Sequence, residues 1–380
     1  MTDALTTMEA FQEYVDLIEA HPNYKRPRAF AVGIAYLDSG ANLLDTYFPL
    51  VNYEENYGTA AVLAAHVNHS HGTGSYVLGH RDLHEILYRF AAFENDGKSH
   101  ANIDVLRALS HRCRLDDHRR IMVVAFLGAE DDDEGPQGVP DVYLRLHLLS
   151  HRRVLPNTIG ASPGAILPKL PNVAWTSEGP VAPTEVSQRQ FDARLNGSSL
   201  RVYGVDKLPH MLDYVVPSGV RIADSARVRL GAYVGDGTTV MPAGFINFNA
   251  GTLGKAMIEG RVSQGVIVGD GSDLGGAAST QGTMSGGSNV VVSIGERTLI
   301  GALAGVGISL GDDCIVAAGV YVMPTTDVFL RDAEGKHLRK VKAYELSGEN
   351  GLMFVQTASG AIQAKPNKKA VELNPILHKN

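Results

Sequence analysis

Cysteine is almost absent from this chain, which has only Cys113 and Cys314 among its 380 residues. Two cysteines cannot form a disulfide framework, and no Cys-x-x-Cys pair is present to bind a metal, so a reducing cytosol is expected. Long apolar runs are also missing, since none approaches the ~20 residues that a membrane span needs. The acidic N-terminus has no basic region followed by an apolar core, so we expect no signal peptide and a soluble, cytoplasmic protein.

An excess of positive charge is lacking too. Lysine and arginine number 34 against 41 acidic residues, and the formal net charge of −7 argues against nucleic acid or a membrane surface as the main partner. Glycine, in contrast, is abundant, with 41 residues that crowd into residues 219–320 without the period of three that collagen requires. With 44% apolar and 20% charged residues, the chain is expected to be globular.

Composition divides the chain into four parts. The predicted domains are an N-terminal α/β domain (1–155), a Pro-rich connector with a short linking segment (156–218), a repeat domain (219–325) and a C-terminal extension (326–380). Six prolines between Pro156 and Pro183 disfavour regular structure, so this stretch is expected to be an extended connector. A helix at 186–195 and a strand at 200–205 are expected after it.

The N-terminal part alternates the patterns of strands and helices. Continuous apolar runs rich in β-branched residues at 29–37 and 120–127 predict buried strands. Helical spacing predicts helices at 82–93 and 102–113, and another helix that begins behind Thr7, a favourable N-cap. The first part is therefore expected to be mixed α/β.

Residues 219–325 show a repeat of six. The repeating branched aliphatic residues are Ile222, Val228, Val234, Val240, Ile246, Val262, Val268, Leu274, Ile294, Ile300, Val306, Leu310, Val316 and Val322. A step of six corresponds to one short strand and one turn, and three steps close a triangular coil whose aliphatic side chains point inward. The predicted fold is a left-handed parallel β-helix of hexapeptide repeats, with an N-terminal α/β domain and a short C-terminal β extension. A β-sandwich would instead show alternation with a period of two.

Two segments interrupt the period of six: residues 247–261 and the Gly-rich residues 280–293. Functional groups are expected on these predicted insertions, because coil residues are used for stacking. No histidine occurs between Met211 and Lys336, which excludes a histidine base within the β-helix. The aspartates of the coils adjoin Gly-rich corners and are expected to be turn residues. Glu259 lies in the first insertion, where partial burial would raise its pKa towards that of a general base, although position alone favours a catalytic and a structural role equally.

A family resemblance is carried by two long runs, FINFNAGTLGKAMIEGRVSQGVIVGDGSDLGGAAST and SGGSNVVVSIGERTLIGALAGVGISLGDDCIVAAGVYV, and by AYELSG after them. These runs resemble the tetrahydrodipicolinate N-succinyltransferase family. The resemblance implies a homotrimer with active sites between subunits, and succinyl-CoA as a co-substrate, with no permanently bound cofactor. It implies that the acceptor is tetrahydrodipicolinate, a cyclic imine dicarboxylate opened by hydration, in the diaminopimelate and lysine pathway. Residues 1–200 resemble the family only loosely, and no residue is carried over from there.

The resemblance also implies roles for individual residues. Glu259 falls on the family's catalytic glutamate, which is proposed to form an acyl-anhydride with the succinyl group; a general-base role is the rival account. The implied succinyl-CoA-binding positions are Arg261, Gly276, Ser279, Ala302, Ala317, Ala318 and Lys342. Ala226 and Ala243 replace the acidic residues that hold a divalent ion at the trimer axis in some members, so no metal ion is expected there.

The chemistry of the substrates supports basic and amide groups in the site. Donor and acceptor together bring three carboxylates, which need guanidinium forks and amide donors. Arg221, Asn247 and Asn249 are therefore predicted to bind the acceptor. An internal hydrogen-bonded amide is the alternative for either asparagine.

Several features leave other interpretations open. His66, His69 and His71 resemble a metal cluster, but no zinc-site spacing matches them, and a polar loop is the alternative. The acidic run EDDDE at 130–134 is expected to be a solvated loop. For the whole chain, the alternatives are another coenzyme-A-dependent N- or O-acyltransferase of this architecture, or a non-catalytic β-helix scaffold.

Overall fold

The computed structural model describes residues 4–95, 100–113, 119–282, 291–369, 371 and 373. The chain forms two compact units, one of Met1–Leu148 with Pro163–Pro209 and the other of Leu149–Ser162 with His210–Asn380. Among the residues so described, none of the helices has the length and apolarity that a membrane crossing requires.

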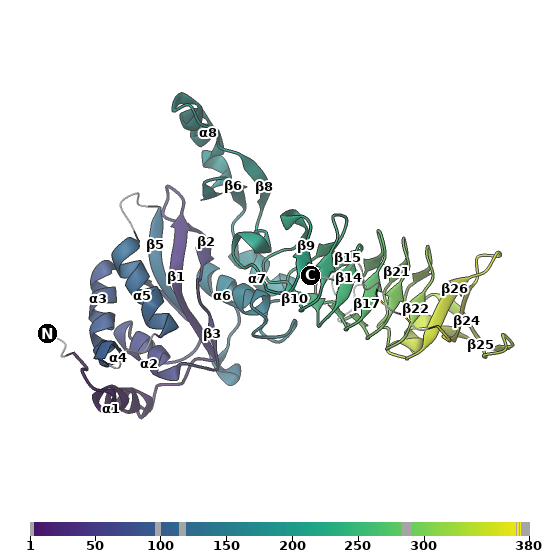
Figure 1. Ribbon diagram of the computed structural model, residues 1–380, viewed down its shortest axis with the longest axis horizontal. Coiled ribbons are helices and arrows are strands. Elements are labelled where there is room, and N and C mark those ends of the chain that lie inside the picture. Colours follow the sequence, from purple (N-terminus) through teal and green to yellow (C-terminus); the bar gives the residue numbers. More distant parts are fainter. Residues whose placement is uncertain are drawn as a thin grey trace. The chain divides into compact units, whose positions relative to one another are not determined.

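The first unit is an α/β structure. Its helices are α1 (Met8–Glu19), α2 (Tyr57–His66), α3 (His80–Arg89), α4 (Ala91–Asn95), α5 (Ala101–Arg112), α6 (Val139–Ser150, which crosses the unit boundary), α7 (Pro163–Ile166) and α8 (Val186–Leu195). Its strands are β1 (Ala29–Leu37), β2 (Leu43–Tyr47), β3 (Asn52–Tyr53), β4 (Gly74–Leu78), β5 (Arg120–Leu127), β6 (Val173–Thr176), β7 (Gly179–Val181) and β8 (Val202–Asp206). The main sheet is antiparallel in the order β2-β1-β5-β4, and β3 pairs with β1. Figure 1 shows α1 to α5 gathered on one face of this sheet.

The predicted core strands of this unit are confirmed. Strands β1 and β5 have the predicted bounds, and alternate residues such as Val124 and Phe126 pack in one apolar core with α1, α2, α3 and α5. The N-cap of α1 is Thr7, whose side chain accepts a hydrogen bond from the Ala10 N–H at 3.2 Å. The predicted helix at 82–93 is instead two helices, because Phe90 leaves helical geometry and buries its ring against Phe11.

The Pro-rich stretch contains more regular structure than the sequence predicts. Strands β6 and β7 form an antiparallel hairpin within it, and β8 completes a sheet in the order β7-β6-β8. Pro180 lies in β7 at the edge of this sheet, where a missing N–H is tolerated. Trp175 of β6 is buried, and its Nε1–H donates to the Asp206 carbonyl at 3.2 Å. The expectation of an irregular connector was therefore wrong for these residues.

The second unit is the predicted left-handed β-helix. Its short strands are β9 (Arg221–Ile222), β10 (Tyr233–Val234), β11 (Thr239–Val240), β12 (Phe245–Ile246), β13 (Gly251–Thr252), β14 (Ala256–Ile258), β15 (Arg261–Val262), β16 (Ile267–Val268), β17 (Ser272–Leu274), β18 (Ser279–Thr280), β19 (Ser293–Ile294), β20 (Leu299–Ile300), β21 (Gly305–Val306), β22 (Ile315–Val316) and β23 (Tyr321–Val322). They form three parallel faces, in the orders β9-β11-β14-β17-β20-β22, β10-β13-β16-β19 and β12-β15-β18-β21-β23. Figure 1 shows the coils following one another from β9 to β22.

The inward stacking that the period of six predicts is confirmed. On one face, Val240, Ile258, Leu274, Ile300 and Val316 are register partners in consecutive coils. Each of these five side chains is fully buried. Burying such an aliphatic side chain contributes ~1.5–3 kcal/mol, and this ladder provides the core of the helix.

Residues 247–261 are not an insertion but part of a coil, which corrects the sequence interpretation. They contain β13 and β14 and reach β15, and each of these strands pairs with a strand of the preceding and the following coil. The period is concealed because Thr252 takes an inward position, where its Oγ1 hydrogen-bonds Thr238 Oγ1 at 2.7 Å. The corner after Ile258 is also short, since Val262 is the next inward aliphatic residue. Most of the second predicted insertion, 280–293, lies outside the described residues.

The predicted C-terminal β extension is confirmed. It consists of β24 (Asp327–Arg331), β25 (His337–Lys342), β26 (Leu352–Gln356) and β27 (Ile362–Pro366). Strand β26 pairs in parallel with β22 and prolongs one face of the β-helix, and the order continues β26-β27-β24-β25. The extension therefore covers the edge that the last coil would otherwise leave open.

Candidate active site

Glu259 lies at the corner of the β-helix between β14 and β15. Its backbone N–H donates a hydrogen bond to the carbonyl oxygen of Leu274, in the next coil, at 2.8 Å. The half-buried side chain leans over the same coil, because its Oε2 lies 3.6 Å from the point where a Cβ on Gly276 would stand. The missing side chain at Gly276 therefore leaves room for the Glu259 carboxylate.

The same corner is built from small residues in the later coils. It includes four of the predicted succinyl-CoA-binding positions, namely Gly276, Ala302, Ala317 and Ala318. The Leu303 N–H donates to the Gly276 carbonyl at 2.9 Å, and the Gly319 N–H donates to the Ala302 carbonyl at 2.9 Å, so successive corners stack. The structure thus brings these positions and Glu259 to one edge of the β-helix. At these four positions no long side chain keeps an extended ligand from the backbone.

Arg261 and Ser279 lie on the face next to this edge. They are register partners on β15 and β18, and Arg261 Nη2 donates a hydrogen bond to Ser279 Oγ at 2.7 Å. Arg261 is exposed, and among the described residues this is the one hydrogen bond that its guanidinium makes. The remaining N–H groups of the fork are therefore available to an anionic ligand.

Asp273 is a residue of this region that the sequence interpretation missed. A turn residue was expected, but Asp273 lies within β17, between its register partners Met257 and Leu299 on the neighbouring strands. Its carboxyl is half-buried; this burial, with the negative charge of Glu259 adding to it, raises its pKa to about 6. The sequence did contain a signal, because Asp273 directly precedes the inward Leu274 and must point outward from the coil.

The residues predicted to bind the acceptor are not all near Glu259. Arg221 lies in β9, two strands away from β14 on the same face. Asn247 Oδ1 accepts a hydrogen bond from Arg229 Nη1 at 3.2 Å. Asn249 is buried and exchanges two hydrogen bonds with Asn157: its Oδ1 accepts from the backbone N–H at 2.7 Å, and its Nδ2 donates to the side-chain oxygen at 3.0 Å.

These contacts favour the internal amide role for Asn249, and an acceptor-binding role remains a prediction for all three residues. Lys342, the last predicted donor-binding residue, lies at the end of β25. Its Nζ pairs with Asp327 Oδ1 at 2.7 Å and donates to the Thr325 carbonyl at 3.1 Å.

Comparison with known proteins decides the family. Residues 9–161 match the profile described as tetrahydrodipicolinate N-succinyltransferase N-terminal, 170–210 the middle profile of the same enzyme, and 291–324 the hexapeptide repeat of succinyl-transferase. A protein of Vibrio cholerae named 2,3,4,5-tetrahydropyridine-2,6-dicarboxylate N-succinyltransferase is 44% identical over 354 residues, which cover 92% of this chain and 99% of that protein. The chain belongs to the tetrahydrodipicolinate N-succinyltransferase family.

Further members of the N-succinyltransferase family agree with this assignment. A protein of Pseudomonas aeruginosa with the same name is 54% identical over 266 residues, or 70% of this chain and 76% of that protein. A crystal structure from Campylobacter jejuni, titled a putative 2,3,4,5-tetrahydropyridine-2-carboxylate N-succinyltransferase, superimposes with a TM-score of 0.87 at 34% identity, covering 97% of this chain and 100% of that one. The matches at 9–161 and 170–210 also correct the sequence interpretation, which found only a loose resemblance in residues 1–200.

The family resemblance singles out Ala226 and Ala243 as the positions where a metal ion would be held in some members. Ala226 and Ala243 are both exposed, and neither side chain carries an atom that binds a cation. Among the residues that the structure describes, no three His, Cys, Asp or Glu side chains are arranged to hold a metal ion.

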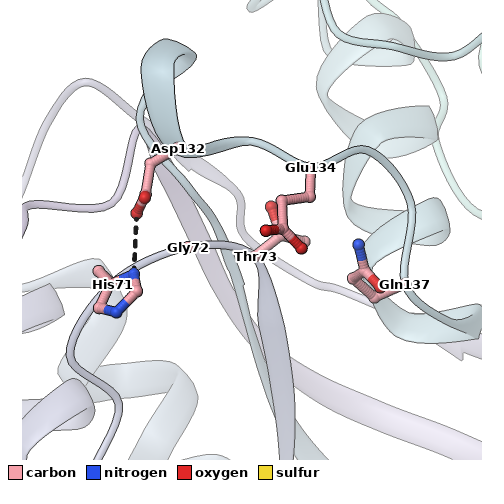
Figure 2. Close-up of a pocket in the computed structure, with 6 residues that line it drawn as sticks. All are labelled: His71, Gly72, Thr73, Asp132, Glu134 and Gln137. Carbon is pink, nitrogen blue, oxygen red and sulfur yellow. Dashed lines mark hydrogen bonds and ion pairs between the residues drawn. The ribbon is translucent and has the colours of Figure 1, made fainter.

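The three histidines that resembled a metal cluster, His66, His69 and His71, have separate partners. His66 Nε2 lies 3.1 Å from Asp82 Oδ1. His69 is buried, with its ring stacked on Phe126 and its Nδ1 3.1 Å from the Tyr76 hydroxyl, and burial lowers its pKa to about 4. His71 lines a cavity of about 180 Å³ with Gly72, Thr73, Asp132, Glu134 and Gln137. Its Nδ1 lies 3.2 Å from Asp132 Oδ2. Figure 2 shows the ring facing Asp132.

The acidic run at 130–134 is not simply a solvated loop. Asp133 accepts hydrogen bonds from the fully buried Arg145, at 2.9 Å from Nη1 and 2.5 Å from Nη2. Burial alone would raise the pKa of Asp133, but these bonds and the charge of Arg145 outweigh it, and the pKa lies below its ordinary value. Part of this run therefore anchors α6 in the N-terminal unit.

Proposed function

We propose that this chain transfers the succinyl group of succinyl-CoA to the amine of tetrahydrodipicolinate, opened by hydration as 2-amino-6-oxopimelate, in the diaminopimelate and lysine pathway. The names of its relatives support this reaction. The observation that carries it is the position of the Glu259 carboxylate at the head of an edge of small residues, two residues from an exposed arginine.

The donor is expected to lie along that edge. The pantetheine arm of coenzyme A is an extended amide chain, and the corners at Gly276, Ala302 and Ala318 offer it backbone groups without obstructing side chains. Arg261, held by Ser279, is expected to bind the succinyl carboxylate through the free part of its fork. Lys342 is expected to bind the phosphates of the nucleotide. Its ion pair with Asp327 would then be replaced by one with the more highly charged phosphates.

Glu259 is expected to provide the chemistry. As a general base it removes a proton from the acceptor amine, whose nitrogen then attacks the thioester carbon. As a nucleophile it takes the succinyl group as an acyl-anhydride, which the amine then opens. Both accounts require an ionised carboxylate beside the thioester, and both end with coenzyme A leaving as a thiol.

We also propose that the enzyme is a homotrimer with its active sites between subunits. Leu303 and Tyr321 support this assembly, because they lie beside the small-residue edge and are 63% and 56% exposed. Symmetric neighbours would cover such side chains, and a closed trimer does so equally in all three subunits. Light scattering should then give a mass near three times 40.7 kDa at micromolar concentration, and a monomer would contradict the shared site.

A cytoplasmic location fits this function. Neither Cys113 nor Cys314 forms a disulfide in the described part of the chain, which agrees with a reducing compartment. The partners proposed are small-molecule substrates, with no nucleic acid and no membrane.

The test is an assay of coenzyme-A thiol release with tetrahydrodipicolinate and a panel of acyl-CoA donors. Succinyl-CoA should give the highest kcat/KM of the panel. A preference for acetyl-CoA would instead favour another N- or O-acyltransferase of this architecture. Absence of thiol release with every donor, from protein that is folded and trimeric, would favour a non-catalytic scaffold.

A further inference from the structure

Asp273 and Glu259 lie on adjacent coils, because Asp273 is the register partner of Met257, two residues before Glu259, and the charge of Glu259 acts on Asp273. Asp273 precedes Leu274, whose carbonyl accepts the hydrogen bond from the Glu259 backbone N–H at 2.8 Å. The Glu259 carboxylate in turn lies over Gly276, three residues after Asp273. Backbone and side chain of Glu259 thus both lie against the four-residue segment that begins with Asp273.

Asp273 has few other partners. Strand β14 presents Met257 to it and β20 presents Leu299, so Glu259 is the titratable group that faces it among the described residues. Within this part of the chain no side chain donates a hydrogen bond to its half-buried carboxyl. With its pKa raised to about 6, chiefly by burial and then by Glu259, Asp273 is ionised at neutral pH but gains a proton readily.

Succinyl transfer requires a group that accepts the proton released by the acceptor amine. In direct transfer, the amine nitrogen bonds to the thioester carbon with its electron pair, the C–S bond breaks with its pair on sulfur, and the N–H proton must leave. In the anhydride account, Glu259 first displaces the thiolate, the amine then bonds to the anhydride carbon, and the bond from that carbon to Glu259 breaks. Glu259 is therefore still acylated while the nitrogen attacks, and another base must take the N–H proton. If Glu259 is the base, it must give the proton up before the next turnover. No histidine between residues 211 and 336 can take that part.

We propose that Asp273 is the second acid–base group of the site, which takes up the proton that the acceptor amine loses and returns it to the coenzyme A thiolate. This inference rests on the proposed succinyl transfer. The balance is complete: amine and thioester become amide and thiol, one N–H bond is exchanged for one S–H bond, and both carboxylates end the cycle ionised. In the general-base account the proton reaches Asp273 through Glu259, and in the anhydride account directly from the amine.

The test is the pH profile of succinyl-CoA turnover for the wild type and for Asp273→Asn. For the wild type, kcat should fall on the acid side with an apparent pKa near 6, because Asp273 must be ionised to accept the proton. Asp273→Asn should lower kcat at least tenfold, since acid–base help is worth ~10²–10⁴ in rate. Its KM should change little, and its acid limb near pH 6 should disappear. Asp273→Glu should restore part of kcat and an acid limb, which a merely structural role would not require.

Asp236→Asn is the matched control, because Asp236 is an exposed aspartate of an earlier coil, outside the site. It should keep the wild-type kcat and pH profile. If folded, trimeric Asp273→Asn also keeps both, the inference is wrong while the proposed function stands. If Asp273→Asn does not fold, the wild-type profile decides, and a flat kcat between pH 5 and 7.5 overturns the inference. If the wild type releases no thiol with tetrahydrodipicolinate and any donor, the proposed function fails and the inference with it.

Discussion

Arg261 and Ser279 occupy equivalent positions in consecutive coils, and the hydrogen bond from Arg261 Nη2 to Ser279 Oγ, at 2.7 Å, holds the guanidinium against the β-helix. This hydrogen bond uses only Nη2 of the planar guanidinium, and the other N–H groups stay exposed two residues from Glu259. In the proposed reaction, this preorganised cation is expected to bind the succinyl carboxylate while Glu259 acts on the thioester end of the same acyl group.

The first prediction concerns the carboxylate of Glu259. Glu259→Gln preserves size and hydrogen-bonding capacity but removes both the base and the nucleophile. Because general-base help alone is worth ~10²–10⁴, turnover with succinyl-CoA should fall at least a hundredfold. Steady-state thiol release measures the loss, and light scattering checks that the oligomer persists.

Glu296→Gln is the control for this variant. Glu296 is an exposed corner glutamate paired with Arg297 at 2.8 Å, on a different corner of the β-helix. The Glu296→Gln variant should retain wild-type turnover. More than a tenth of wild-type activity in Glu259→Gln would exclude both roles proposed for Glu259.

The glycines of the active-site corner give a second prediction. A Cβ on Gly275 would lie 2.8 Å from the Ala302 backbone nitrogen, so Gly275→Ala forces the backbone apart and should cost ~1–3 kcal/mol of stability. A Cβ on Gly276 would meet only Glu259 Oε2, at 3.6 Å, which is ordinary van der Waals contact. Gly276→Ala should therefore keep the melting temperature but lower kcat by crowding the carboxylate. Equal melting temperatures for both variants would contradict this description of the corner.

The β-helix could be predicted from the sequence because its determinant is local and repetitive. One aliphatic side chain every six residues specifies strand, turn and stacking together. The prediction failed where a residue other than an aliphatic one takes the inward position. Thr252 can point inward because its hydroxyl forms a hydrogen bond within the coil, and residues 247–261 therefore looked like an insertion. The resemblance therefore remains the ground for the catalytic role predicted for Glu259. The positional argument, that Glu259 lies in an insertion, was wrong.

Contacts between distant segments explain what else the sequence could not reveal. Asp273 looked like a turn residue, because only the register between β14 and β17 brings it near Glu259. Asp133 looked solvated, because its partner Arg145 lies on a helix further along the chain. In both cases the sequence correctly predicts a polar position. The interacting residue could not be predicted, because the fold brings it there from another segment.

A third prediction concerns that buried pair. Arg145 is fully buried and contacts Asp133 at 2.5 Å and Asp141 at 3.7 Å. Arg145→Met would leave the buried Asp141 and the partly exposed Asp133 without their cation, which should destabilise the N-terminal unit by ~3–5 kcal/mol. Thermal unfolding followed by circular dichroism should show a lower first transition. Arg81→Met, which removes an exposed pair with Glu85, should leave that transition unchanged, and a similar effect of both variants would refute the distinction.

The last prediction separates donor binding from chemistry at Arg261. Arg261→Lys keeps the charge but loses the planar fork, so it should still be impaired with succinyl-CoA. Acetyl-CoA lacks the free carboxylate of the succinyl group and should be a poor donor for the wild type, because the site's cation is then left unpaired. If Arg261 binds that carboxylate, the variant should lose most of the succinyl-over-acetyl preference in kcat/KM. If Arg261 contacts the coenzyme instead, kcat/KM should fall equally for both donors and the preference should survive.

Ser279→Ala is the companion variant. It frees the guanidinium from its 2.7 Å hydrogen bond, and should reduce the preference less than Arg261→Lys does. Unchanged kinetics with both donors in Arg261→Lys would remove this arginine from the site.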